Sequence, residues 1–472
     1  MRKKIQHYVC GCLTRREFMY RAGMMALAPS ALAAPMSLKE VTPRDFFPGS
    51  GIPETLRERL ANRLLGDLRV TDPAFDDYYQ QMAQVLSPGD DYLIVTAGSD
   101  DINAFAHYGG LVIMMRGMWR FADNEDALLG IVAHEMGHVK LNHFESRKKL
   151  NDQISAISVP LLIAGLLAGS AEVRESIIVG GSGIITGQIY GHSRELEHEA
   201  DVVGLKMLTR SGRDGREMSA LLGRLAGATN EYVSTHPAPL RRSAYIKNRL
   251  LSGQQTPPRN SAAFLILREK LAAASGGSKF IQNKQKALKD ADADESVAYQ
   301  LGIMLVAAKG GNRKLGDEME LELSESSHPF VSAARADYVS RGGDHQRAFN
   351  ITAEARESYP QSAALAVQQV ASLRRAKEHR EVIKLQKSLP NTLSERPDIL
   401  RETAQSALVL GMNAQANIFL ARAHIRGGEF ELAQRQLDIA ARDKMDTRML
   451  VETNKLRNII KRELSAMAAK KG

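Results

Sequence analysis

The sequence contains very little cysteine. Cys10 and Cys12 are the only cysteines among 472 residues, and both precede an arginine pair and a short apolar stretch. If that region is a cleaved export signal, the mature chain has no disulfide, even in an oxidising compartment. No cysteine follows the apolar stretch, which argues against a lipid anchor there. The length leaves room for two or three domains, each with its own hydrophobic core.

We find no apolar run long enough to cross a bilayer. The segment from Ser158 to Ser170 is apolar for about twelve residues, whereas a spanning helix needs ~20. We expect a buried helix or an active-site lid here; the alternative is a loop that touches a membrane. Membrane contact is therefore expected to be peripheral at most.

A basic stripe of the kind that binds nucleic acid is also missing. The formal net charge is +9, but residues 1–33 alone carry +5, which leaves +4 for all the other residues. Such an excess is ordinary for the remaining length and argues against a basic stripe. We therefore predict no nucleic-acid partner.

The N-terminal region has the features of an export signal. "TRREFM" (Thr14 to Met19) is similar to the twin-arginine motif, and a short apolar stretch follows from Ala22 to Ala33. That stretch ends in Ala31-Leu32-Ala33, with small residues at the two positions that a signal peptidase requires. We predict a twin-arginine signal peptide over residues 1–33 and a mature protein in the periplasm. The alternative is an N-terminal helix with a chance arginine pair.

Strand-like segments occur only in a short region of the first half. The runs 92–97, 103–108 and 111–115 are separated by "GSDD" and "GG", as a small antiparallel sheet requires. Helical spacing dominates the rest, and "QQTPPRN" (Gln254 to Asn260) would interrupt a helix. We predict a mostly helical α+β domain over residues 34–253, a linker over 254–260 and an all-α domain over 261–472.

The second half contains a repeat. "SRGGDHQRAF" and "IRGGEFELAQ" align Gly343 with Gly428 and Ala348 with Ala433. A glycine at a turn followed by small residues on the next helix is the tetratricopeptide pattern, because alanines let two helices approach closely. We therefore predict tetratricopeptide-like repeats; a non-repeating helical bundle is the alternative.

"IVAHEMGHVK" (Ile131 to Lys140) is the strongest chemical signal. His134 and His138 are four residues apart, so on a helix both imidazoles project from one face towards one point. Imidazole nitrogens at this spacing suit zinc. Glu135 lies beside the first ligand and can take a proton from water. We predict one Zn²⁺ per chain, bound by these histidines, with Glu135 as the general base.

A third ligand is expected in "SRELEHEADVVG" (Ser193 to Gly204), where several acidic residues compete. The helical stripe through Glu197 also contains Asp201 and Gly204, and its small residues allow close approach to the first helix. We choose Glu197 as the ligand and Asp201 as the acceptor of a histidine N–H. The alternative is a solvated acidic helix. His143 lacks the glycine turn of a third-histidine motif, and we interpret it as a surface histidine or a neighbour of the ligands.

These motifs together resemble the HExxH gluzincin metallopeptidases, the family that includes the CAAX prenyl proteases and HtpX-like peptidases. "HEMGH" and "ELEHEAD" match its two hallmarks, and "INAFAHYGGLVIMMRGM" is similar to the stretch before its motif helix. The resemblance implies a zincin-type fold and peptide-bond hydrolysis. Within the family, the chain is most similar to a soluble, exported branch that carries tetratricopeptide repeats.

Two further expectations come from the resemblance. In that branch a His-Pro loop places its histidine near the zinc, where it can fill the open position; "STHPAPLRR" maps this histidine to His236 and the motif arginine to Arg242. The resemblance implies a regulatory role for His236, whereas the residues alone equally suit an ordinary loop histidine. The strand Leu111 to Met115 is expected to be an edge strand that binds extended substrate.

We therefore predict a periplasmic zinc-dependent endopeptidase. Its helical repeats would recruit unfolded or misassembled envelope proteins, or the outer-membrane assembly machinery, for quality control or assembly. The alternative is a repeat-based periplasmic chaperone or adaptor with a largely latent metal site, which a blocking His236 would explain.

Overall fold

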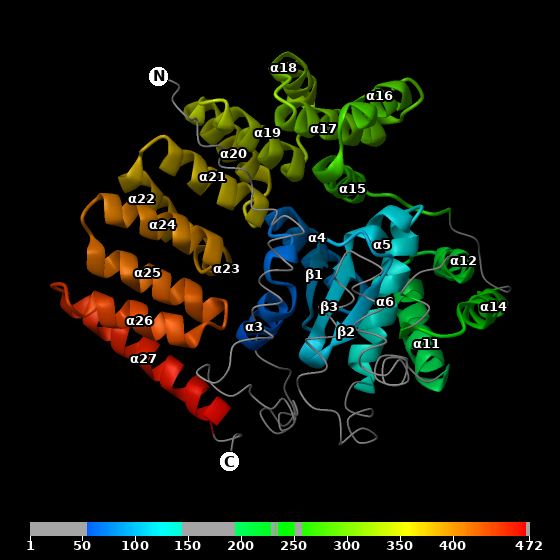
Figure 1. Ribbon diagram of the computed structural model, residues 1–472, viewed down its shortest axis with the longest axis horizontal. Helices are drawn as coiled ribbons and strands as arrows, with labels where there is room; N and C mark the ends of the chain where they lie inside the picture. The colour runs from blue at the N-terminus through cyan, green and yellow to red at the C-terminus, as the bar shows by residue number, and fades with distance from the viewer. Residues whose placement is uncertain (1–53, 144–193, 228–231, 233–234, 251–256, 469–472) are drawn as a thin grey trace, which may run out of the picture.

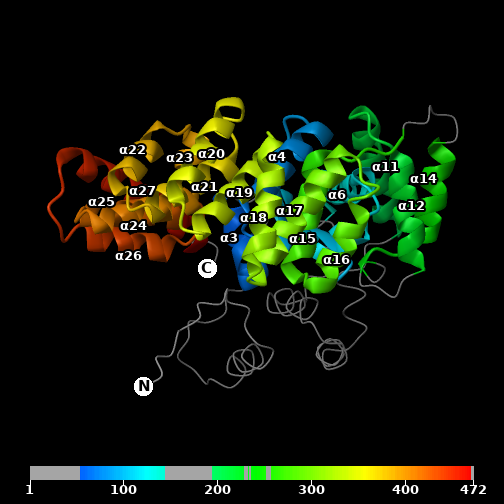
Figure 2. The same cartoon turned by 90° about the horizontal axis from the view of Figure 1, so that it is seen from above.

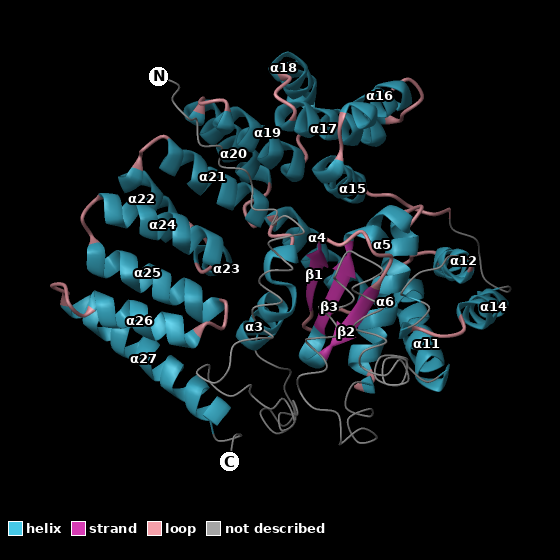
Figure 3. Cartoon of the chain, viewed as in Figure 1, coloured by secondary structure: helices cyan, strands magenta, loops and turns pink. Residues whose placement is uncertain are grey.

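The computed structural model describes residues 54–143, 194–227, 232, 235–250 and 257–468. The expected signal peptide and the apolar segment from Ser158 to Ser170 lie outside the described residues. Within the described parts, no helix is both long enough and apolar enough to span a membrane. The fold is mostly helical and includes one three-stranded sheet, as predicted (Figure 3).

The sheet is mixed, not antiparallel as predicted. Its strands are β1 (Leu93–Ala97), β2 (Ala104–His107) and β3 (Leu111–Met115), arranged in the order β1-β3-β2. β3 runs parallel to β1 and antiparallel to β2. The predicted edge strand, β3, is therefore the central strand, and the prediction was wrong. All five of its residues are buried, which is typical of a strand covered on both faces.

Successive side chains of the sheet enter two different cores, as the two-residue period of a strand requires. Val95 and Ile113 pack against α3 (Glu54–Leu65) on one face. Ile94 and Val112 belong to the main core on the other face. α4 (Pro73–Leu86) and α6 (Glu125–Lys140) pack against the sheet, and the short α5 (Arg116–Phe121) leads from β3 towards α6 (Figure 1).

Three more helices complete the first half: α11 (Arg194–Arg210), α12 (Gly215–Ala226) and α14 (Pro239–Leu250). α11 approaches α6 at glycine positions on both helices. A Cβ on Gly204 would lie 3.0 Å from the backbone of Ala133 and His134, and one on Gly137 would lie 2.8 Å from the carbonyl oxygen of Ala200. The small residues of the Glu197 stripe therefore do bring the two helices together.

The second half is all-helical in the part of the chain that the structure describes, and its helices form an arc beside the first half (Figures 1 and 2). The helices are α15 (Ala262–Ser275), α16 (Ser278–Ala287), α17 (Ala293–Lys309), α18 (Arg313–Glu322), α19 (Pro329–Arg341), α20 (His345–Ser358), α21 (Ala363–Arg375), α22 (His379–Ser388), α23 (Asn391–Ser394), α24 (Pro397–Val409), α25 (Asn413–Arg426), α26 (Phe430–Ala440) and α27 (Thr447–Ala468).

The two aligned segments occupy equivalent places in this arc. Gly343 and Gly428 have positive φ in the turns before α20 and α26. Ala348 and Ala433 are both fully buried in the helices that follow. These features explain the sequence repeat, and the tetratricopeptide assignment stays a prediction.

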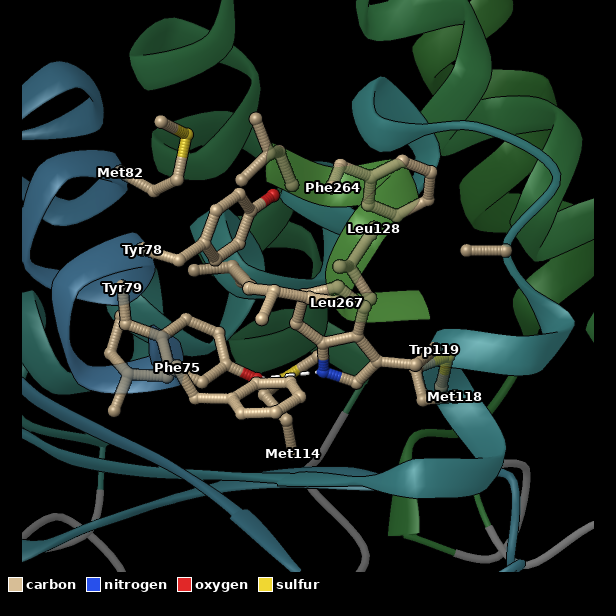
Figure 4. Close-up of a cluster of buried hydrophobic side chains, with 14 of the residues drawn as sticks. Phe75, Tyr78, Tyr79, Met82, Met114, Met118, Trp119, Leu128, Phe264 and Leu267 are labelled. Atoms are coloured by element: carbon tan, nitrogen blue, oxygen red, sulfur yellow. Dashed lines mark hydrogen bonds between the residues drawn. The ribbon is translucent and has the colours of Figure 1, made fainter. Parts of the chain in front are cut away.

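The hydrophobic core continues from the first half into α15. Trp119 of α5 stacks on Phe264 of α15, with ring centroids 5.7 Å apart and an interplanar angle of 16°. The indole N–H of Trp119 donates to the hydroxyl of Tyr79 at 2.8 Å (Figure 4). The predicted domain division at 254–260 stays a prediction, but the residues on its two sides share one core.

The arc also returns to the first half through α4. The carboxylate of Asp77 accepts hydrogen bonds from the backbone N–H groups of Ala363 and Ala364 at the N-terminus of α21. Its neighbour Asp76 pairs with Arg396, which precedes α24, at 2.8 Å. An acid at a helix N-terminus satisfies N–H groups that have no partner in the helix. The side chains of α4 therefore help to set where the arc lies.

Candidate metal centre

α6 carries the two histidines and the glutamate of the HExxH motif. The helix begins after Asn124, whose side chain accepts from the backbone N–H of Ala127. His134, Glu135 and His138 are almost completely buried. The Nε2 atoms of the two histidines lie 3.0 Å apart, so both rings do point to one place.

α11 brings Glu197 and Asp201 to the same place, and both side chains are fully buried. The carboxylate of Glu197 lies 3.4 Å from His134 Nε2 and 3.2 Å from His138 Nε2. Asp201 Oδ1 lies 2.9 Å from the other ring nitrogen of His134, Nδ1. The structure therefore brings Glu197 to the converging nitrogens and Asp201 to the outer side of one ring, in the arrangement predicted.

His236 completes a cluster of four donors. Its Nδ1 lies 3.1 Å from Glu197 Oε1 and 3.4 Å from His134 Nε2. One donor atom from each of the four residues lies within 4.8 Å of the other three. The other nitrogen of His236, Nε2, lies 3.3 Å from the backbone carbonyl oxygen of Ala104 at the start of β2.

The donor set fits zinc. Four ligands about 2 Å from a tetrahedral ion lie roughly 3.3 Å from one another, and five distances between these donors are 3.0–3.4 Å. Three imidazoles and one carboxylate are ordinary zinc ligands. The cluster can therefore hold a divalent cation.

The carboxylates of the cluster favour positive charge beside them, whereas burial and the neighbouring His134 lower the pKa of His138 well below its usual range. Burial and the nearby Arg242 oppose a charged imidazole, but the carboxylates of Glu197 and Asp201 raise the pKa of His134 to about 9. Burial likewise opposes a charged Glu197, but His236, Arg242 and His134 lower its pKa well below the usual range. A bound cation would take the place of the proton between these groups.

Arg242 links the two carboxylates of α11. Its Nε and Nη2 donate to the two oxygens of Asp201 at 2.8 and 2.7 Å, and its Nη1 lies 2.5 Å from Glu197 Oε2. A bidentate guanidinium–carboxylate pair fixes geometry as well as charge. Arg242 therefore orients Asp201 and through it the ring of His134.

His143 is buried and lies against the outer side of the second ligand ring. Its Nδ1 is 2.8 Å from Nδ1 of His138, and its Nε2 is 3.1 Å from Glu199 Oε2. The sequence left it as a surface histidine or a neighbour of the ligands; the surface interpretation is wrong. His143 instead supports His138 from the side away from the donors.

Glu135 differs from Glu197 and Asp201 in the hydrogen bonding of its carboxylate. Among the described residues, neither of its carboxylate oxygens has a hydrogen-bond partner. The Nε2 of His236 lies 3.4 Å from Glu135 Oε1. A buried carboxylate without hydrogen bonds is costly, so this position is best explained by a role with substrate or water.

The sequence did not single out two contacts of His236. Tyr232 stacks on its ring, with centroids 4.3 Å apart and an interplanar angle of 21°. The carbonyl of Ala104 comes from a strand that is remote in sequence. Tyr232 could have been noticed because it precedes His236 by four residues, one helical turn; the Ala104 contact has no comparable local signal.

Comparison with known proteins agrees with this geometry. Residues 75–250, which include the whole cluster, match the model of peptidase family M48. These residues are an M48 peptidase domain. The predicted resemblance to the gluzincin metallopeptidases is confirmed, and the zinc on which this family depends fits the donor cluster.

Curated relatives of the M48 domain include two proteins named beta-barrel assembly-enhancing protease. The one from Escherichia coli strain K12 is 31% identical over 201 residues, which are 38% of this chain and 40% of the relative. The one from Yersinia pestis is 29% identical over 205 residues, 41% and 40% of the two chains. The chain thus spans about two fifths of the length of these relatives.

A more distant relative is the mitochondrial metalloendopeptidase OMA1 of Schizosaccharomyces pombe. It is 27% identical over 158 residues, which cover 32% of this chain and 44% of the relative. All three relatives are named as proteases or peptidases, and each match covers less than half of either chain.

Proposed function

We propose that the chain is a zinc-dependent endopeptidase, with His134, His138 and Glu197 as metal ligands and Glu135 as general base. The observation that carries this proposal is the buried carboxylate of Glu135, which accepts no hydrogen bond from the described residues, beside a four-donor cluster in an M48 domain. Bound zinc would polarise the scissile carbonyl and make water more acidic.

The residues of the chain then do the following. Glu135 accepts the proton of the attacking water and passes it to the leaving amine. Asp201 accepts a hydrogen bond from His134 Nδ1, which leaves Nε2 of that ring as the donor atom. Arg242 holds both carboxylates of α11 in place.

β2, at the edge of the described sheet, replaces β3 as the proposed docking strand for substrate. β3 pairs on both sides, whereas β2 pairs with β3 alone among the described strands. An extended peptide could add to β2 through backbone hydrogen bonds. The carbonyl of Ala104 in β2 lies 3.3 Å from His236 Nε2, so this strand is next to the donor cluster.

His236 is proposed to act as a gate. Its Nδ1 lies among the metal donors, and zinc with four protein ligands leaves no position for water or substrate. We expect His236→Ala to increase turnover of an unfolded model substrate while zinc stays bound. If His236 instead stabilises the transition state, the same change lowers turnover, and the gate proposal fails.

The proposed cellular role is quality control or assembly of outer-membrane proteins in the periplasm, with tetratricopeptide-like repeats recruiting substrates or the assembly machinery. The names of the relatives from Escherichia coli and Yersinia pestis support it. Export would depend on the arginine pair Arg15 and Arg16. Replacing both by lysine should abolish periplasmic protein; unchanged export would contradict the twin-arginine route.

The second candidate is a chaperone or adaptor with a latent metal site, which the position of His236 favours. Degradation of an unfolded protein by the wild type and by Glu135→Gln separates the two. An endopeptidase loses cleavage in the variant. A chaperone prevents aggregation of the substrate equally well in both and cleaves it in neither.

Metal analysis tests the ligand set directly. His134→Ala and Glu197→Ala should lose the zinc that the wild-type protein binds at one per chain. Stoichiometric zinc in Glu197→Ala would remove Glu197 from the ligand set.

A further inference from the structure

Tyr232 lies against the gate residue through two contacts. The backbone N–H of His236 donates to the Tyr232 carbonyl at 2.7 Å, so the two residues are one helical turn apart. Their rings are nearly parallel, with centroids 4.3 Å apart. Tyr232 is fully buried, so its ring gives His236 a fixed flat surface.

The stack limits how the His236 imidazole can turn. One ring nitrogen faces Glu197 and His134, and the other faces the Ala104 carbonyl and Glu135. A ring that stacks on a fixed partner cannot tilt out of that plane without losing the contact. The stack therefore favours the orientation in which Nδ1 is a metal donor.

The phenol hydroxyl of Tyr232 does not take part in this contact. It is buried and has no hydrogen-bond partner among the described residues. The Cζ atom of Arg242 lies 6.0 Å from the centre of the tyrosine ring. The aromatic face, which a phenylalanine would also supply, is thus what contacts His236.

The backbone on the other side of His236 is strained. Ala238 has a φ of 59° and directly precedes Pro239. Left-handed φ is unfavourable for alanine, and a following proline further disfavours helical conformations. Strain of this kind is found in switch regions, where the surrounding structure maintains it.

We propose that Tyr232 is a positioning residue that holds His236 among the metal donors against the strain at Ala238. This inference rests on the proposed gate and names what keeps it closed. Loss of the stack moves His236 away from the metal and opens the fourth position. Removing the strain at Ala238 stabilises the closed position of His236, so the gate opens less often.

The test compares Tyr232→Leu, Tyr232→Phe and His236→Ala in protein loaded with Co²⁺, whose visible absorption depends on the kind and geometry of its ligands. Tyr232→Leu should shift the spectrum towards that of His236→Ala and increase turnover about two- to tenfold, the range expected for loss of one ring stack. Tyr232→Phe keeps the ring and should match the wild type in both measurements.

Ala238→Gly provides the opposite change, because glycine adopts positive φ without strain. It should leave the Co²⁺ spectrum unchanged and lower turnover about two- to fivefold. If Tyr232→Leu does not fold, this variant decides alone, and equal or higher turnover overturns the proposal.

The outcomes also separate this inference from the proposed function. A His236→Ala spectrum identical to the wild type shows that His236 is not a donor, and the gate itself fails. A changed His236→Ala spectrum with an unchanged Tyr232→Leu spectrum overturns only the role of Tyr232. A Tyr232→Phe variant that behaves like Tyr232→Leu would assign the effect to the hydroxyl and contradict the proposal.

Discussion

α6 buries Glu125 at its N-terminus and Glu135 in its interior, and the hydrogen bonding of these two carboxylates differs. At the N-terminal end, Glu125 accepts hydrogen bonds from Tyr78, Arg213 and both the backbone N–H and the hydroxyl of Ser261. Half-way along the helix, Glu135 is equally buried and has no hydrogen-bond partner among the described residues.

This difference distinguishes a structural carboxylate from a reactive one. The partners of Glu125 come from α4, from the turn before α12 and from the cap of α15, so this residue joins both halves of the chain. Glu135 accepts no hydrogen bond from the described residues and has only the Nε2 of His236 3.4 Å from one of its oxygens, so it gains no such stabilisation. Two glutamates of equal burial on one helix therefore have opposite expected effects on folding and on activity.

The largest expected effect is on catalysis. Glu135→Gln should lower turnover of an unfolded substrate by about 10²–10⁴-fold, because the general base is lost. Zinc content should not change, and the melting temperature should stay equal or rise because a buried carboxylate without hydrogen bonds is replaced by a neutral amide. Turnover close to that of the wild type would contradict the role of Glu135 and its contrast with Glu125.

The next effect is on folding. Glu125→Ala leaves the charge of Arg213 without one of its two carboxylate partners and should reduce the free energy of unfolding by about 3–5 kcal/mol. Urea unfolding followed by circular dichroism measures this loss. The matched control is Asp123→Asn, an exposed acid paired with Arg224, which should cost less than about 1 kcal/mol. Equal losses in both variants would refute the comparison.

A smaller effect is expected at the outer side of the metal centre. His143→Ala should still bind zinc, but with an affinity about 10–100-fold lower, because His138 loses the partner that orients its ring. Competition with a chelator gives this value. Unchanged affinity would show that the contact between the two histidines does not support the metal.

The smallest effect should come from Glu199→Gln. The side chain of Glu199 is 58% exposed and lies 3.1 Å from the far nitrogen of His143, and exposed ion pairs contribute about 0–1 kcal/mol. Zinc affinity should fall less than about fivefold. A loss as large as that of His143→Ala would mean that the carboxylate, and not the imidazole, supports His138.

Local patterns in the sequence predicted much of the centre. The spacing of His134 and His138 follows from helix geometry alone, and the small residues around Glu197 predicted the close contact between α6 and α11. The resemblance supplied His236 and Arg242, which no local pattern distinguishes from ordinary loop residues.

The incorrect expectations concern contacts between distant segments. β3 was expected at the edge of an antiparallel sheet, but strand order depends on pairing that the apolar pattern of one strand does not specify. The sequence did not decide whether His143 is a surface residue or a neighbour of the ligands, because its burial depends on α11, which begins more than fifty residues later. The continuity of the core across the predicted linker also depends on the Trp119–Phe264 contact, which neither segment reveals alone.

That contact gives the protein an intrinsic optical reporter. Trp119 is the only tryptophan in the chain, and it lies between α5 of the M48 domain and α15, the first helix of the arc. Its emission therefore arises from a single place, where the two halves meet. A ligand of the arc that shifts α15 would change the emission wavelength or intensity of Trp119. Conformational coupling between the halves can therefore be followed in unlabelled protein.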